Sequence, residues 1–487
     1  MTATAVGSGP VATTRRVPGP SSAWWIVLVG VAFTAAELAF VSPRMGLSWD
    51  EVVYVSQVSG RVPAAWFDPA RARGVPLIVA PITWLTGSII ALRIYLSVLS
   101  GLGVVLALLV WRPRSGERGR EAWVLAVAGV AFGGLWVAQY YGPQAMPDMW
   151  SALGSLAAVG FFVRWTASRH WSSLAGLAGC IALVALVRPG DAVFLCLPLV
   201  GWAVVVRQWR PLTALMAGAL AGGAEWVIEA IVRFGGIGAR LHAAGAEQSG
   251  FGLHFALLDE LKALNGPTLC RPCTVGYRQP ELDLWWLLLP VIVVLGVIGA
   301  RRAGRFGSSL LPAVCAFCMA AQYLFMINYS APRFLLPAYA LAAIPVADAV
   351  AWAIGAASGS AGAALRPTVI AALSALMSVQ LVAQHVVLDH EAGGTVTFHD
   401  DYTTIATRLH QLGVRAPCVI SGVQYIPIAY YAGCASAAGS RGTPVLLVGV
   451  GKHPPPGLIG HWHAYRIKGT NVLHVTAYLP SLHVLRA

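Results

Sequence analysis

Residues 23–41 read AWWIVLVGVAFTAAELAFV, and residues 46–54, just beyond them, read GLSWDEVVY. The first stretch has the length and apolar character of a membrane span, which needs about 20 such residues. It is too long for the core of a signal peptide and lacks a small-residue cleavage site, so we expect an uncleaved first helix. The second stretch carries the adjacent carboxylates Asp50 and Glu51. Because charge near a bilayer is costly and tends to mark a functional site, these two carboxylates are the first candidates for functional residues.

The whole chain shares the apolar character of its first span. It has 487 residues, of which 57% are hydrophobic and 11% charged, and its mean hydropathy is +0.68. This composition excludes an ordinary soluble globular protein of this length. The net charge of +13 arises from arginines in short clusters between apolar spans. That pattern sets membrane topology, so we expect membrane lipid and no nucleic acid as a partner.

Arginines, glycines and prolines divide the chain into about eleven apolar spans of membrane-crossing length. The predicted spans are 23–41, 88–111, 122–141, 149–166, 173–187, 191–206, 211–233, 283–300, 308–328, 334–355 and 367–387. The predicted fold is therefore a polytopic α-helical membrane protein.

The arginine clusters fall in alternate loops and so mark one face of the membrane. They are Arg15 and Arg16, then Arg112, Arg114, Arg118 and Arg120, Arg164 and Arg169, Arg207 and Arg210, Arg301, Arg302 and Arg305, and Arg366. By the positive-inside rule that face is cytoplasmic, together with the N-terminal tail 1–22. The outer face then receives residues 42–87, residues 234–282 and everything after about residue 388. We expect a multi-pass protein of the cell (plasma) membrane.

Residues 388–487 differ from the preceding module 23–387. Short β-rich runs at 414–421, 443–450 and 471–478 alternate with turns and helix-like stretches. This alternation predicts a small extracytoplasmic α/β domain.

Four of the eight cysteines lie in the predicted outer segments: Cys270, Cys273, Cys418 and Cys434. They allow three pairings, and sequence proximity favours Cys270 with Cys273 and Cys418 with Cys434. A CxxC can also hold a metal or act in redox chemistry, but a second CxxC or a histidine at ligand spacing is absent. We favour structural disulfides.

Charged residues also collect at other outer turns: Asp148, Arg188, Asp191 and Arg333. Packing of the helices as a bundle is expected to bring these turns together over a common cavity. Each residue has a simpler explanation as well. Asp148 would favour a helix dipole, Arg188 and Asp191 would close a turn as an ion pair, Arg333 would reach lipid headgroups, and Asp50 would cap a helix.

The ordered set of outer motifs resembles the GT-C glycosyltransferases, particularly the branch of protein O-mannosyltransferases and aminoarabinose transferases. The resemblance runs from about residue 23 to 350. Its motifs are Trp49-Asp50-Glu51, Gly74-Val-Pro76-Leu77, Ala91-Leu-Arg93, Pro147-Asp148, Arg188-Pro189 and Arg333-Phe-Leu-Leu-Pro337. The family's paired prolines appear here as Val75-Pro76, and the second acidic motif is short. High Ala, Val, Gly and Arg content with few Lys further suggests a high-GC bacterium such as an actinobacterium.

The resemblance implies transfer of a sugar from a polyprenyl monophosphate donor to a hydroxyl of a cell-envelope glycan, lipid or protein acceptor on the outer face. Arabinose and mannose are the candidate sugars. Asp50 would act as general base in an inverting displacement, a role for which some elevation of its pKa by burial is useful. Glu51 would orient substrate or keep Asp50 poised. The outer segment 234–282 and the C-terminal domain are expected to shape the acceptor pocket.

The remaining outer residues would bind substrate. Arg333 is the first candidate, and Arg188 the second, for stabilising the leaving phosphate, because guanidinium binds phosphate bidentately. Asp148 would contact sugar hydroxyls or a divalent cation, a cofactor that the resemblance leaves open. Asp191 completes this set.

A transporter or flippase of a lipid-linked or envelope precursor is the alternative function, since it too places ionisable residues inside a helical bundle. Transporters usually have charges at the midplane, broken helices and internal repeats. Here the charges lie at the outer mouths of the spans and no repeat is evident. A membrane scaffold whose outer domain binds a partner is a third reading.

Overall fold

The computed structural model describes residues 23–113, 120–248, 250, 252–357, 364–436, 440–455, 457 and 462–480. The predicted cytoplasmic tail 1–22, with Arg15 and Arg16, lies outside the described residues, as do Arg114 and Arg118.

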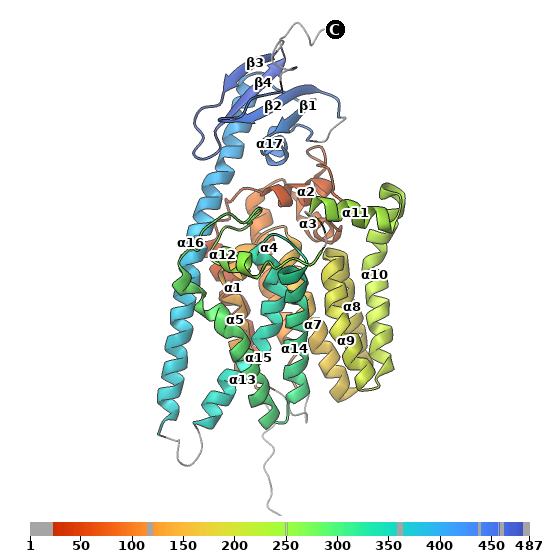
Figure 1. The fold of residues 1–487 in the computed structure, drawn as a ribbon, viewed down its shortest axis with the longest axis vertical. Helices are drawn as coiled ribbons and strands as arrows, with labels where there is room; N and C mark the ends of the chain where they lie inside the picture. Colours follow the sequence, from red (N-terminus) through yellow and green to blue (C-terminus); the bar gives the residue numbers. More distant parts are fainter. Residues whose placement is uncertain are drawn as a thin grey trace, which may run out of the picture.

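A bundle of long helices forms the body of the protein (Figure 1). Its members are α1 Trp24–Phe40, α4 Ile89–Leu109, α5 Ala122–Gly133, α7 Pro147–Ser168, α8 Trp171–Val187, α9 Pro189–Val205, α10 Trp209–Phe234, α13 Leu284–Arg302, α14 Phe306–Phe325, α15 Leu336–Ala356 and α16 Arg366–Gln411. Six helical segments of the described chain are long and apolar enough to cross a membrane. These segments lie in α4, α10, α13, α14, α15 and α16. The chain is therefore a membrane protein, while the count of about eleven crossings stays a prediction.

Short helices cover one end of the bundle. They are α2 Trp49–Ser59, α3 Gly74–Leu85, α6 Trp136–Tyr141, α11 Ile237–Glu247, α12 Leu257–Ala263 and the 3₁₀ helices η2 Pro280–Asp283 and η3 Pro332–Leu335. Most of them belong to the segments that the charge pattern assigns to the outer face.

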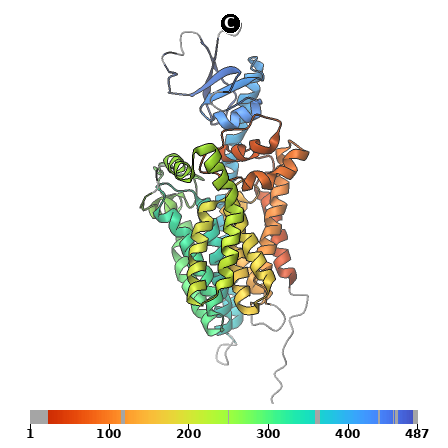
Figure 2. The ribbon, with the colours of Figure 1, turned by 90° about the vertical axis from the view of Figure 1, so that its right-hand side faces the viewer.

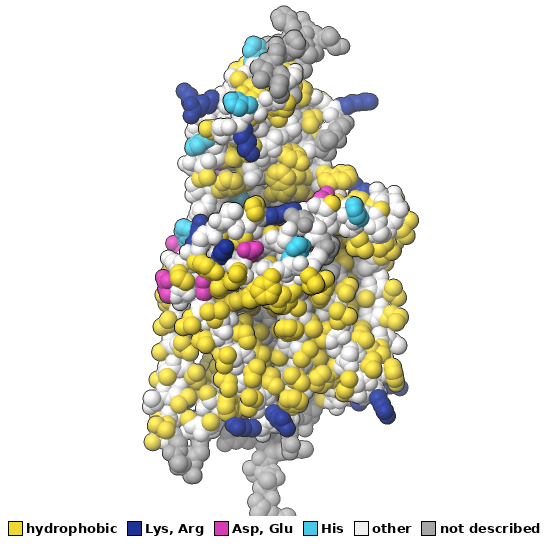
Figure 3. Space-filling view, viewed as in Figure 1, with side chains coloured by type: hydrophobic (Ala, Val, Ile, Leu, Met, Phe, Trp, Pro, Cys, Tyr) yellow, Lys and Arg dark blue, Asp and Glu magenta, His cyan; other side chains and the backbone are white. Residues whose placement is uncertain are grey.

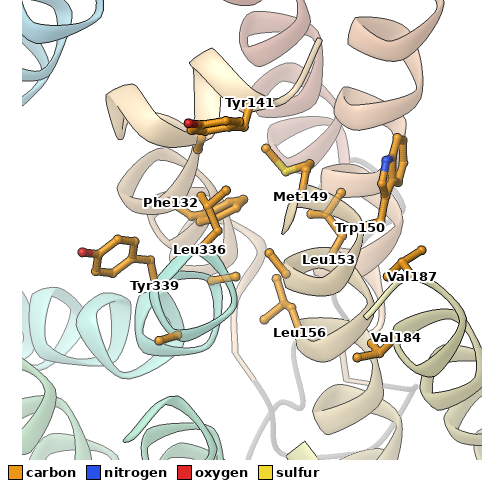
Figure 4. Close-up of a cluster of buried hydrophobic side chains, with 14 of the residues drawn as sticks. Phe132, Tyr141, Met149, Trp150, Leu153, Leu156, Val184, Val187, Leu336 and Tyr339 are labelled. Carbon is orange, nitrogen blue, oxygen red and sulfur yellow. The ribbon is translucent and has the colours of Figure 1, made fainter. Parts of the chain in front are cut away.

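Helix α7 lies at the centre of the bundle core. Its side chains Met149, Leu153 and Leu156 point toward Leu336 of α15 and Val184 of α8 (Figure 4). Nearly the whole circumference of α7 is buried. Because α7 begins at the end of the bundle that the short helices cover, this packing holds its first turn in a fixed place.

The predicted span 122–141 is divided into two helices, α5 and α6. The break follows the pair Gly133-Gly134, and two glutamines satisfy the backbone groups that it exposes. The N–H of Trp136 donates to the side-chain oxygen of Gln384 (3.0 Å), and the Gln139 side chain donates to the Gly133 carbonyl (3.0 Å). The prediction of one continuous helix is wrong because the alternative partners are side chains, which apolar periodicity does not reveal.

A four-stranded sheet lies above the bundle (Figure 2). It consists of β1 Cys418–Gly422, β2 Thr443–Gly449, β3 Trp462–Arg466 and β4 Val475–Pro480 in the order β1-β2-β4-β3, with helix α17 Tyr425–Ala432 beside it. Strand β1 pairs with β2 in parallel, and the other two pairs are antiparallel. A disulfide joins Cys418 to Cys434. Strand β3 was not predicted, since its side chains are largely exposed and lack alternation.

The C-terminal end of α16 packs against this sheet and α17. Ile405 and Leu409 of α16 pack with Ile428 of α17 and Val445 of β2 in one buried cluster. The predicted boundary at residue 388 therefore falls inside a single helix that runs along the bundle and ends under the sheet (Figure 1).

Hydrophobic side chains cover most of the lower body on the face in Figure 3, and Lys and Arg side chains lie at its lower edge. This distribution is typical of a membrane protein with basic residues at the bilayer boundary. Which side faces the cytoplasm stays a prediction.

Candidate active site at the outer end of the bundle

The start of α2 is held by a capping box. The Glu51 N–H donates to the Ser48 hydroxyl (3.4 Å), and the Ser48 N–H donates to the Glu51 carboxylate (2.9 Å). The sequence Ser48-Trp-Asp-Glu51 is the known signature of this cap, so the start of α2 could have been predicted from it. Ser48 is the cap residue, which corrects the simpler reading that Asp50 caps the helix.

Asp50 belongs to a row of ion pairs with alternating sign, which we call the ion-pair chain. Its members, in spatial order, are Arg71, Asp50, Arg333, Asp148, Arg188 and Asp191.

The links of the ion-pair chain join five segments that are distant in sequence. Asp50 lies 2.7 Å from Arg71 and 3.1 Å from Arg333. Arg333 approaches Asp148 at 3.7 Å, Asp148 accepts a hydrogen bond from Arg188, and Arg188 lies 3.8 Å from Asp191. The structure thus brings together five of the six acidic and basic residues that the sequence singled out.

The ion-pair chain borders a cavity of about 770 Å³ at the end of the bundle that the short helices cover. Asp50, Asp148, Arg188 and Arg333 line it, and tyrosines and glutamines complete the wall. The outer segment contributes Glu247, Gln248, Leu269 and Arg271, and the C-terminal region contributes Phe398, Tyr402 and Gln424. Both regions that were expected to shape an acceptor pocket therefore reach this cavity.

Asp50 is the most exposed carboxylate of the ion-pair chain, with 28% of its side chain accessible. Burial acts to raise its pKa, but the charges of Arg71 and Arg333 outweigh burial and lower the pKa to about 2. The elevation of the pKa that would help a general base is therefore absent in this arrangement, because Asp50 has two arginine partners that the sequence did not reveal. Asp50 is fully ionised at neutral pH.

Glu51 points away from the cavity and is completely buried. It forms an ion pair with Arg93, accepts from the Ala145 N–H (2.9 Å), and closes the capping box. Arg93 in turn donates to the carbonyls of Met45, Gly46 and Pro143 at 2.8–3.2 Å. The prediction that Glu51 orients substrate is corrected, since successive side chains on a helix diverge by about 100° and Asp50 takes the cavity side.

The Glu51–Arg93 pair fixes the two segments that carry the cavity carboxylates. One is the entry to α2, which presents Asp50, and the other is the turn at residues 143–145, which leads into Asp148. Arg93 belongs to one of the quoted motifs, but no role had been assigned to it.

Asp148 and Asp191 are both completely buried and differ in their access to the cavity. Asp148 lines the cavity, and its Oδ2 accepts no hydrogen bond from any described residue. Asp191 accepts from Ser151, Gln322 and Tyr323 and does not line the cavity. The structure therefore places Asp191 beside Arg188 and outside the cavity lining, and its predicted role in substrate binding stays a prediction.

Arg71 is the site residue that the sequence reading missed. It lines the cavity, pairs with Asp50 and Asp68, and lies over the Tyr54 ring, 4.9 Å from its centre. A usable signal existed, since arginines in the segment 42–87 run against the positive-inside rule that assigns this segment outside.

Segment 234–282 holds the turn that carries Arg333 through backbone hydrogen bonds. Cys270 and Ser330 exchange two backbone hydrogen bonds (2.9 and 3.2 Å), and a disulfide joins Cys270 to Cys273. Glu260 of α12 is buried against the same turn. Burial raises the pKa of Glu260 to about 7, although the Ser330 side chain and the Ala331 N–H partly oppose the shift.

The cavity residues do not fit a resident divalent cation. Within the described residues, no group of three or more His, Cys, Asp or Glu side chains is placed to hold a metal. Asp50 and Asp148 each have arginine partners, whereas Mg²⁺ and Ca²⁺ prefer carboxylates that are free to coordinate.

No family model and no curated protein sequence matches this chain. Solved structures of GT-C glycosyltransferases are similar in fold. ArnT from Cupriavidus metallidurans, solved with bound undecaprenyl phosphate, matches with a TM-score of 0.63 and 14% identity over 94% of this chain and 98% of its own. The oligosaccharyltransferase AglB from Archaeoglobus fulgidus, solved with an inhibitory peptide and a dolichol-phosphate, matches with a TM-score of 0.50 and 11% identity over 85% and 64%. At such low identity the likeness concerns the fold.

The Glu51–Arg93 pair yields a stability prediction. Glu51→Gln leaves Arg93 buried beside a neutral amide, and breaking one side of a buried ion pair costs about 3–5 kcal/mol. We expect a clear fall in the thermal unfolding temperature of the detergent-solubilised protein. Glu121→Gln, at an exposed carboxylate, is the control and should leave that temperature unchanged. Equal unfolding temperatures for wild type and Glu51→Gln would contradict the anchoring role.

Glu260 yields a pH prediction. Its pKa is raised from about 4.5 to about 7 on folding, so its contribution to stability is present below pH 4.5 and is lost as pH rises through 7. Gln at this position does not titrate. Glu260→Gln should therefore gain stability relative to wild type between pH 5 and pH 8, by roughly 1–3 kcal/mol. Thermal unfolding of both proteins at pH 5 and pH 8 measures this change. If the stability difference between Glu260→Gln and wild type is the same at both pH values, the raised pKa of Glu260 is ruled out.

Proposed function

We propose that this chain is a membrane glycosyltransferase that transfers a sugar from a polyprenyl monophosphate donor to an acceptor hydroxyl. The observation that carries the proposal is the ion-pair chain, which presents three arginines and an ionised carboxylate to one cavity. The ArnT-like fold supports it, since ArnT was solved with undecaprenyl phosphate. The cavity faces outward in this proposal, so the donor and acceptor meet on the extracytoplasmic side.

The donor phosphate binds to the arginines that Asp50 now neutralises. Arg333 and Arg71 both lie within 3.1 Å of the Asp50 carboxylate and both line the cavity. The donor phosphate is a diester with one negative charge, and its two non-bridging oxygens bind guanidinium groups bidentately, so it competes for the same N–H groups. The departing monoester gains a second negative charge, which strengthens this binding as the reaction proceeds. Arg188 remains paired with Asp148 and adds positive charge from the next position.

This exchange of partners prepares Asp50 as general base. The two arginines hold the pKa of Asp50 at about 2, which makes it a weak base. When the phosphate takes their hydrogen bonds, the pKa of Asp50 rises toward the range useful for accepting a proton. Donor binding thus activates the base, and an acceptor alone meets an unreactive carboxylate.

The reaction is a single inverting displacement. The acceptor O–H gives its proton to Asp50 as its oxygen bonds to the anomeric carbon of the sugar. The bond from that carbon to the phosphate oxygen breaks, and the polyprenyl phosphate leaves with its charge held by Arg333 and Arg71. A retaining route would need a carboxylate nucleophile and a covalent intermediate.

Asp148 binds the sugar. Its buried Oδ2 has no hydrogen-bond donor among the described residues and lies 3.7 Å from Arg333, so a sugar hydroxyl that enters when Arg333 turns to the phosphate can donate to it. Arabinose and mannose are the proposed sugars, and a glycan, lipid or protein of the cell envelope is the acceptor. Segment 234–282 and the C-terminal region supply the acceptor side of the cavity.

The test uses purified protein with undecaprenyl-phosphate mannose, decaprenyl-phosphate arabinose and a panel of envelope glycans, lipids and peptides. Asp50→Asn and Arg333→Ala should each lower the rate of sugar transfer by at least about 100-fold, because each removes a group that acts in the transition state. Product anomers determined by NMR should be inverted relative to the donor.

Asp400→Asn and Arg408→Ala are matched controls on the exposed face of α16 and should keep wild-type rates. Activity within a few-fold of wild type in both site variants would reject these roles. Vectorial movement of the lipid-linked sugar in proteoliposomes without a glycosylated product would favour the transporter or flippase.

A further inference from the structure

Helix α11 lies beside the loop that carries Arg71. It follows α10 after a sharp turn at Gly235 and Gly236, whose φ values are +79° and +133°. The end of α11 reaches the cavity at Glu247 and Gln248. Its first turn carries Arg240, which is completely buried although it belongs to an outer segment.

Arg240 binds the backbone of residues 69–71, which we call the Arg71 loop. Its Nε donates to the Pro69 carbonyl (3.0 Å), and one terminal nitrogen donates to the Arg71 carbonyl (2.8 Å). The other terminal nitrogen donates to the Trp226 carbonyl (2.7 Å) of α10. One guanidinium therefore joins the Arg71 loop to α10.

The surroundings of Arg240 keep this guanidinium in one orientation. It lies over the rings of Trp226 and Phe234, 4.4 and 4.8 Å from their centres. Glu229 of α10 pairs with it at 3.0 Å, and Glu229 also pairs with Arg73 and Arg233. The planar guanidinium presents its N–H groups at fixed angles and can donate to two carbonyls at once. The ammonium group of a lysine cannot do so in the same geometry.

We infer that Arg240 is a positioning residue for Arg71. By holding the carbonyls of Pro69 and Arg71, it keeps the Arg71 side chain within reach of the position that the donor phosphate occupies. Arg71 is itself a phosphate-binding residue in this account. The inference rests on the proposed function, because the phosphate is that of the polyprenyl donor.

A purely structural role would make a different prediction. If Arg240 only stabilised the outer segment, its loss and the loss of Arg71 would weaken phosphate binding independently. If Arg240 acts through Arg71, removing both side chains costs no more affinity than removing Arg71 alone. A double-mutant cycle separates these cases.

The experiment measures binding of undecaprenyl phosphate to the full chain in nanodiscs by isothermal titration calorimetry. We expect Arg71→Met to weaken binding by about 10-fold, as for loss of a charge-assisted contact. Arg240→Lys keeps the positive charge beside Glu229 but removes the guanidinium that donates to the two carbonyls. The variant should therefore fold and still weaken binding by about 5- to 10-fold. The affinity of the double variant, Arg71→Met with Arg240→Lys, should lie within about twofold of the affinity of Arg71→Met alone.

Arg233→Met is the matched control, since Arg233 pairs with the same Glu229 and is 40% exposed. It should bind within about twofold of wild type. Wild-type binding by Arg240→Lys, or additive losses in the double variant, would overturn the positioning role alone. Failure of the wild-type protein to bind undecaprenyl phosphate would overturn the phosphate role of Arg71 and the proposed function with it.

Discussion

The alternating ion pairs among Arg71, Asp50, Arg333, Asp148 and Arg188 are the interaction on which the cavity end of the bundle depends. Charges that leave water need partners, and a row of alternating sign gives every interior member two. The same row keeps arginines available at a cavity without leaving positive charge unpaired before a ligand arrives. A phosphate can then enter by exchange for a carboxylate at the same guanidinium groups.

The two adjacent carboxylates of α2 perform different tasks because a helix points them in different directions. Asp50 faces the cavity and takes part in the ion-pair chain, whereas Glu51 joins Arg93 in a buried anchor. The anchor holds the entry to α2 and the turn before Asp148, so the geometry of the ion-pair chain rests on a second, fully buried pair. His399 of α16 and Tyr431 of α17 also contact residues 46 and 47, which links the C-terminal region to the same entry.

The membrane character and most of the ion-pair chain could be predicted from the sequence, because isolated charges at the mouths of apolar spans are conspicuous. Arg71 was missed, although an arginine in a segment assigned to the outer face runs against the positive-inside rule. The role of Glu51 depended on Arg93, a partner 42 residues away. The break between α5 and α6 depends on Gln384 of α16, a contact that local periodicity does not encode. The lowered pKa of Asp50 followed from two arginines whose approach only the packed structure reveals.

The central claim is that a lipid-linked phosphate replaces Asp50 as the partner of Arg333 and Arg71. A cryo-electron microscopy structure of the protein in nanodiscs with undecaprenyl phosphate tests it most directly. We expect phosphate oxygens about 3 Å from both guanidinium groups, with the Asp50 carboxylate released toward the cavity. A phosphate bound elsewhere, with both arginines still paired to Asp50, would contradict it.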